Sequence, residues 1–114
     1  MGGAAARRKG ADFERWLVHR VAEVFGEGLV RRGLQFRGGA EVPDVDAPGL
    51  WIECKRGKKV PIRTALEQAV SDSLGKGRWP VVACKEDRAE PFVVMRLDDF
   101  LDLLREWWSV RGHR

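Results

Sequence analysis

The strongest constraint on the fold is a pair of short β-type segments that together carry two carboxylates and one amine. The segments are residues 42–45 and 50–55, and a turn-forming run at 46–49 separates them. In a strand, successive side chains point to opposite faces, so Glu53 and Lys55 share a face of the second segment. The pattern predicts an antiparallel hairpin with its charged groups on one side.

The register of this hairpin determines which charges meet. If the turn is centred on Pro48-Gly49, Asp44 lies across from Glu53, with Cβ atoms roughly 5 Å apart. Two bare carboxylates at that separation repel each other, unless a hard divalent cation such as Mg²⁺ binds between them. Lys55 is then placed to orient a water molecule or to offset the charge of a phosphate.

The hairpin resembles the two-part motif of the PD-(D/E)XK nuclease superfamily. Pro43-Asp44 matches the first half of the motif, and Glu53-Cys54-Lys55 matches the second half. The order of the surrounding parts is most similar to the small archaeal-type Holliday junction resolvases and their phage and bacterial relatives.

Two further features carry this resemblance. The group has a basic N-terminus that runs into a helix with an acidic residue, here Glu14, followed by a loop with Gly and Arg, here residues 37–39. The resemblance extends over residues 7–104, most of the chain. It implies an α/β fold with a restriction-endonuclease-like core, in which helices flank a central mixed β-sheet.

The resemblance also implies a chemistry and a site. The expected reaction is Mg²⁺-dependent hydrolysis of a phosphodiester by in-line attack of water, with Mn²⁺ as a substitute and no small-molecule cofactor. The expected catalytic residues are Glu14, Asp44, Glu53, Lys55 and Gln68, and the expected metal ligands are Glu14, Asp44, Glu53 and the backbone carbonyl of Cys54.

The charge distribution favours a nucleic-acid partner. The net charge is +4, and residues 1–63 hold 13 Lys and Arg against 8 Asp and Glu, whereas residues 64–114 hold 8 against 9. Cationic residues bind phosphates with release of counterions. The expected DNA-binding residues are Arg7, Arg8, Lys9, Arg37, Gly38, Gly39, Arg56, Lys58, Lys59 and Arg63.

Several of these residues also have a plain structural interpretation. Glu14 could pair with a nearby arginine at the edge of an apolar stripe, and Gln68 could be a solvated helix position. Of Trp107 and Trp108, we expect one in the core and the other exposed, where it would mark a subunit contact. The two cysteines show no zinc-binding spacing and are interpreted as small buried apolar residues.

The length of 114 residues suits one domain with one core. We expect a flexible basic N-terminal arm at 1–9, a nuclease domain at 10–108 and a C-terminal tail at 109–114. No stretch resembles a signal peptide or a membrane span, so a cytoplasmic location in a bacterial, archaeal or phage-infected cell is expected.

The predicted elements alternate between helices and strands. A capping-box pattern at 64–67 predicts the start of the second helix. The expected helices cover 10–25, about 64–74 and a segment from 98, and the expected strands cover 29–34, 42–46, 50–55, 80–85 and 91–95.

The predicted function is a structure-specific DNA endonuclease of the Holliday junction resolvase type, acting in recombination, repair or phage genome processing. Symmetric cutting of a four-way junction needs two sites, which predicts a C2 homodimer. Two alternatives stay open: a nuclease of the same fold that acts on flaps, single strands or other DNA, and a non-catalytic DNA-binding module.

Overall fold

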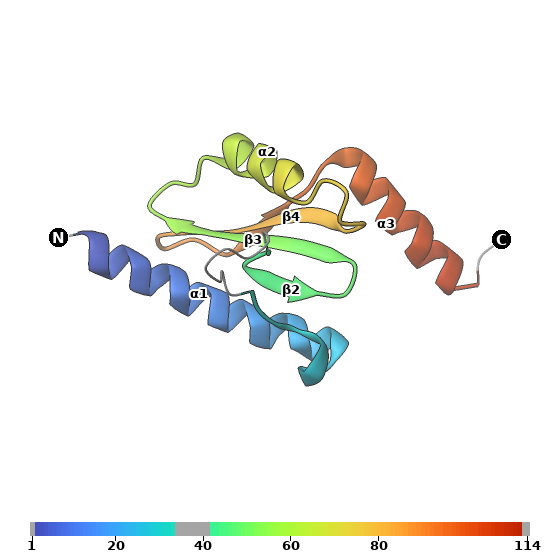
Figure 1. The fold of residues 1–114 in the computed structure, drawn as a ribbon, viewed down its shortest axis with the longest axis horizontal. Coiled ribbons are helices and arrows are strands. Elements are labelled where there is room, and N and C mark those ends of the chain that lie inside the picture. Colours follow the sequence, from blue (N-terminus) through green and yellow to red (C-terminus); the bar gives the residue numbers. More distant parts are fainter. Residues whose placement is uncertain (1, 34–41, 113–114) are drawn as a thin grey trace.

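The computed structural model describes residues 2–33 and 42–112, and these form a mixed five-stranded sheet flanked by helices (Figure 1). The α/β fold class is therefore confirmed, and the helices and strands follow the predicted order. The elements are α1 (Gly2–Phe25), the 3-10 turn η1 (Glu27–Leu29), β1 (Arg31–Arg32), β2 (Val45–Ala47), β3 (Leu50–Gly57), α2 (Ile62–Asp72), β4 (Trp79–Glu86), β5 (Phe92–Val94) and α3 (Leu97–Val110).

Strands β2 and β3 form the predicted hairpin. Val45 pairs with Ile52 and Ala47 with Leu50, in the register that a turn centred on Pro48-Gly49 requires. Gly49 has a positive φ of 73°, a conformation that glycine adopts at little cost. The local alternation and the turn residues were thus sufficient to predict which residues face each other.

The remaining strands extend the sheet in chain order, β1-β2-β3-β4-β5. Strands β3 and β4 are parallel, whereas the other neighbours are antiparallel. A parallel pair needs a crossover connection, and α2 supplies it. This crossover holds α2 over the face of β3 that carries Glu53.

Each face of the sheet has its own core. Phe13 and Ala22 of α1 pack with Val45, Ile52 and Ala83 on one face. On the other face, α2 packs against β4, and the buried residues there are Val60, Ala65, Ala69, Val82 and Cys84. Figure 1 shows α1 along one side of the sheet and α2 on the opposite side.

The N-terminal prediction was wrong. Residues 2–9 are not a separate arm, because α1 begins at Gly2 and runs without interruption to Phe25. Ala4, Ala5 and Ala6 explain this result, since alanine has the highest intrinsic helix propensity. The basic residues that follow therefore stand on a helix.

Three other boundaries also differ from the prediction. Helix α2 starts at Ile62 after Pro61, so Thr64 lies inside the helix and does not cap it. The expected strand at 29–34 is reduced to Arg31–Arg32, because η1 occupies the preceding residues. Strand β3 continues to Gly57, beyond the predicted end at residue 55, so Arg56 belongs to the strand.

Helix α3 packs only sparsely against the other described elements. It extends from the end of the molecule opposite the N-terminus, within overall dimensions of 56 × 34 × 27 Å (Figure 1). Trp107 and Trp108 are both about half exposed, so the expectation that one of them enters the core was wrong. Within residues 2–33 and 42–112, we find no helix with the length and apolarity needed to span a membrane.

Candidate active site

Asp44 and Glu53 meet on the α2 side of the sheet. Val45 and Ala47 of β2 point into the α1 core, so the alternating residues Asp44 and Asp46 point to the other face. Glu53 lies on this same face, because its neighbours Ile52 and Cys54 pack with the α1 core. The hairpin thus brings the two predicted metal ligands together.

A fixed donor orients each of the two carboxylates. Oδ2 of Asp44 accepts a hydrogen bond of 2.9 Å from the backbone N–H of Cys54. Oε2 of Glu53 accepts a hydrogen bond of 2.9 Å from the indole Nε1–H of Trp51, which is buried. Because both donors belong to β3, the strand itself sets the positions of the two carboxyl groups.

The surroundings of Asp44 and Glu53 oppose the simultaneous ionisation of both carboxyl groups. Burial and then the nearby charge of Asp44 raise the pKa of Glu53 from 4.5 to about 8, and a hydrogen bond between the two carboxyls adds to the rise. The Trp51 hydrogen bond acts in the opposite direction. At neutral pH the pair therefore retains a proton, or it binds a cation in place of that proton.

Lys55 stands on the same face as Glu53, about 7 Å further along the strand. Its side chain is exposed, as a group that contacts a substrate phosphate must be. Strand alternation therefore places Lys55 on the same face as the carboxyl pair.

Glu14 does not join this pair. Its Oε1 accepts hydrogen bonds from Arg32 of β1, 2.8 Å from one terminal guanidinium nitrogen and 3.2 Å from Nε. The side chains of Glu14 and Arg32 are 20% and 30% exposed respectively, so this ion pair is partly shielded from water. Glu14 therefore pairs with an arginine, which was the structural alternative to a metal-binding role. The arginine is Arg32 of β1 and not a neighbour on α1.

Cys54 separates Glu14 from the pair. Its side chain packs with the α1 core, and burial followed by the charges of Asp44, Glu14 and Glu53 raises its thiol pKa. All three carboxylates thus surround the middle of β3. Even so, residues 2–33 and 42–112 contain no group of three or more His, Cys, Asp or Glu side chains arranged to bind a metal.

Gln68 lies on α2 and donates a hydrogen bond of 2.9 Å from Nε2 to Oδ1 of Asp72. The charge of Asp72 also contributes to the raised pKa of Glu53, so this end of α2 faces the carboxyl pair. Sequence reasoning missed Asp72, although its position four residues after Gln68 places both on one side of the helix.

The candidate DNA-binding residues have different surroundings. Arg56 is partly buried and donates to Oδ1 of Asp87 at 2.6 Å, and Lys9 lies 3.6 Å from the same oxygen. Arg56 therefore has a structural role at the β3–β4 end. Arg37, Gly38 and Gly39 lie outside the described residues, whereas the exposed candidates are Arg7, Arg8, Lys9, Lys58, Lys59 and Arg63.

Gly33 holds the backbone of Asp44 in place through a hydrogen bond. Its backbone N–H donates to the carbonyl of Asp44 at 3.0 Å. A Cβ atom at this position would lie only 1.8 Å from the carbonyl oxygen of Pro43. Only glycine fits here, and the contact fixes the segment that leads into β2. The sequence offered no signal for this role.

Comparison with known proteins adds no assignment, since no family model and no curated protein matches the chain. The candidate site is accordingly defined by its own geometry: a carboxyl pair held by β3, an amine on the same face, and cationic side chains on α1, α2 and the turn after β3.

Proposed function

We propose that this protein is a Mg²⁺-dependent endonuclease with a restriction-endonuclease-like core that cuts branched DNA, with four-way junctions as the preferred substrate. The observation that carries the proposal is the contact between Asp44 and Glu53, which raises the pKa of Glu53 to about 8. Two carboxylates in that position are typical of a site for a hard divalent cation.

The residues present fit such an ion. Asp44 and Glu53 offer oxygen ligands, and their mutual repulsion in the absence of a cation is the property that cation binding relieves. Asp44, Glu53 and the carbonyl of Cys54 would bind the ion. When bound, it polarises the scissile phosphate and lowers the pKa of a water ligand.

The side chains of the protein perform the remaining tasks. The Cys54 N–H and the Trp51 indole hold the two carboxyl groups in place. Lys55 orients the attacking water or offsets the negative charge that develops on the phosphate. Glu14 contributes its charge from the other side of β3, where Arg32 restrains it.

The preference for branched DNA rests on the kind of surface residues that this small domain can offer to DNA. Most of its 114 residues form the sheet and the helices that flank it. The exposed basic residues suit contacts with phosphates and not with base edges. Recognition of backbone shape is therefore favoured over recognition of sequence. Symmetric cleavage of a junction requires two such sites in a C2 homodimer.

The decisive experiment incubates the purified protein with a labelled four-way junction, a flap, a single strand and a duplex at equal concentration, with Mg²⁺ or EDTA. We expect paired nicks in the junction that are lost in EDTA and in Asp44→Asn and Glu53→Gln. Glu67→Gln on the exposed side of α2 is the matched control and should cut normally.

The other outcomes separate the alternatives. Preferential cutting of flaps or single strands would retain the chemistry and reject the junction. Salt-sensitive DNA binding without cutting in Mg²⁺ or Mn²⁺ would contradict the nuclease and establish a DNA-binding module. Calorimetric titration with Mg²⁺ tests the metal site independently of activity, since Asp44→Asn should abolish the binding heat.

A further inference from the structure

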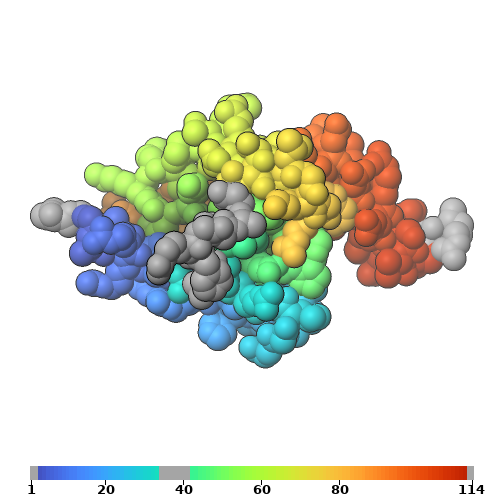
Figure 2. Space-filling view, viewed as in Figure 1, coloured from blue at the N-terminus to red at the C-terminus, as the bar shows by residue number. Residues whose placement is uncertain are grey.

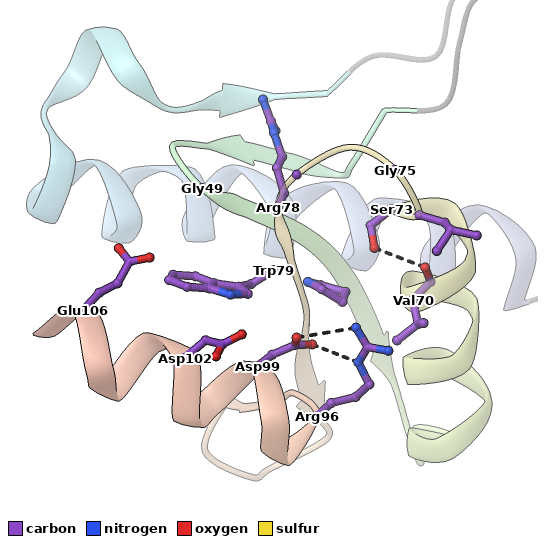
Figure 3. A pocket seen from close by; sticks show the side chains of 13 residues that line it. Gly49, Val70, Ser73, Gly75, Arg78, Trp79, Arg96, Asp99, Asp102 and Glu106 are labelled. Atoms are coloured by element: carbon purple, nitrogen blue, oxygen red, sulfur yellow. Dashed lines mark hydrogen bonds and ion pairs between the residues drawn. The ribbon is translucent and has the colours of Figure 1, made fainter.

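Helix α3 turns its carboxylates toward the rest of the molecule. Asp99, Asp102 and Glu106 line a cavity of about 460 Å³ between α3 and the region of Trp79, and Figure 3 shows them along the side of the helix that faces this cavity. Asp99 is 9% exposed and accepts a hydrogen bond of 2.9 Å from Arg96. The polar side of this amphipathic helix is therefore its inner side.

The apolar side of α3 faces outward as a consequence. We call it the α3 stripe, formed by residues three or four apart. Their exposed fractions are 69% for Leu97, 43% for Phe100, 39% for Leu104 and 50% for Trp107. Figure 2 shows α3 standing out from the body of the molecule. A contiguous exposed apolar surface along one helix favours an interaction site.

Next to the α3 stripe, and sharing Leu104 and Trp107 with it, the helix surface has the shape that a second helix needs. A hollow of about 370 Å³ lies among Leu101, Leu104, Arg105, Trp107 and Trp108. Four of these residues have the spacing i, i+3, i+4 and i+7, which forms the diamond-shaped hole that accepts a side chain from a facing helix. A leucine or phenylalanine of a partner helix would fill it.

The charges beside the α3 stripe identify that partner. Asp98 and Arg105 are seven residues apart, so they stand on the same edge of the stripe, one near each end. In an antiparallel pair of identical helices, Asp98 of each copy lies beside Arg105 of the other. In a parallel pair the two copies of this edge lie on opposite sides of the interface, so neither contact forms. In the single chain, Arg105 contacts Asp102 at 2.6 Å, and both side chains are exposed and free to rearrange.

We propose that the α3 stripe is a self-association surface, on which a second copy of this chain packs its own α3 in antiparallel orientation about a twofold axis. The arrangement is isologous, so each copy supplies the same stripe and both Asp98–Arg105 contacts form. A standard interface buries ~800 Å² per partner, and the exposed side chains of the stripe would form its apolar centre.

The proposed interface does not depend on Asp44 or Glu53, and α3 contributes none of the candidate catalytic residues. A protein that cuts junctions as a dimer, and whose Leu104→Glu variant stays dimeric, would contradict the interface alone. A dimer that cuts nothing would contradict the nuclease alone.

Sedimentation equilibrium of the full chain at micromolar concentration tests the proposal. We expect twice the monomer mass of 12.9 kDa for the natural sequence, and the monomer mass for Leu104→Glu with an unchanged circular dichroism spectrum. The control Ser109→Glu places the same charge away from the stripe and should remain dimeric. A monomeric natural protein, or a Leu104→Glu variant that stays dimeric, overturns the proposal.

A charge swap tests the antiparallel orientation. Arg105→Asp alone should weaken self-association by about fivefold or more, because it sets a carboxylate in place of the guanidinium beside Asp98 of the other copy. Adding Asp98→Arg should restore the natural affinity. If the double variant associates no better than Arg105→Asp alone, the antiparallel arrangement is wrong.

Discussion

The backbone N–H of Cys54 donates a hydrogen bond of 2.9 Å to Oδ2 of Asp44. This contact links the residue before β2 to the middle of β3, and it holds one carboxylate of the candidate site against the strand that carries the other. Neither strand alone can form the site. Changes to the Asp44 side chain should therefore affect both the metal affinity and the ionisation of Glu53, whereas a substitution of the Cys54 side chain keeps the backbone donor.

Asp44→Asn should return the pKa of Glu53 from about 8 toward 4.5. The substitution removes the negative charge that opposes ionisation of Glu53 and keeps a side-chain oxygen for the Cys54 N–H. Nuclear magnetic resonance of ¹³C-labelled glutamate follows the titration directly. An unchanged Glu53 titration would show that burial alone causes the shift.

Removal of divalent metal should make stability fall with rising pH. The folded protein has a raised Glu53 pKa, so this group favours the folded state below its usual pKa of 4.5 and loses that contribution as the pH rises through about 8. We expect the Tm in EDTA to drop by several degrees over this range. Mg²⁺ should recover most of the loss at pH 8.

Glu53→Gln supplies the control for this pH dependence. Glutamine cannot ionise, so the variant should show a flatter Tm profile between pH 4.5 and 8 and a smaller response to Mg²⁺. Differential scanning calorimetry in matched buffers measures both. A profile as steep as that of the natural protein would assign the pH dependence to another group.

Arg32→Met should destabilise the fold by about 1–3 kcal/mol, because Glu14 then loses its partner in a partly buried position. Urea denaturation measures the change in the free energy of unfolding. The double variant Glu14→Gln/Arg32→Met should be less destabilised than Arg32→Met alone, since no unpaired charge remains. If both variants lose the same free energy of unfolding, the unpaired charge of Glu14 is not the cause of the destabilisation.

Gly33→Ala should destabilise the protein and weaken Mg²⁺ binding, because a Cβ would lie 1.8 Å from the Pro43 carbonyl oxygen and must displace the segment that carries Asp44. Gly10→Ala is the matched control. It lies within α1 with no neighbour within 4 Å of the added carbon, so it should stabilise the helix by about 1 kcal/mol. Urea denaturation and Mg²⁺ titration test both variants.

The sequence alone determined the features that depend on local pattern. Alternation in residues 50–55 and the turn at Pro48-Gly49 were enough to predict the hairpin, its register and the meeting of Asp44 with Glu53. These follow because strand geometry has a period of two and the turn sets the pairing. The order of helices and strands was predictable because the two kinds of element have different apolar periods, 3.6 residues in a helix and 2 in a strand.

Only the tertiary structure decided the features that join distant segments. The partner of Glu14 is Arg32, eighteen residues away on another element, and the glycine that supports Asp44 is Gly33 of the neighbouring chain segment. Helix α3 has a clear apolar side in the sequence, yet its carboxylates face the molecule and its apolar side faces solvent. Periodicity shows that a helix has two sides, but packing determines which side faces inward.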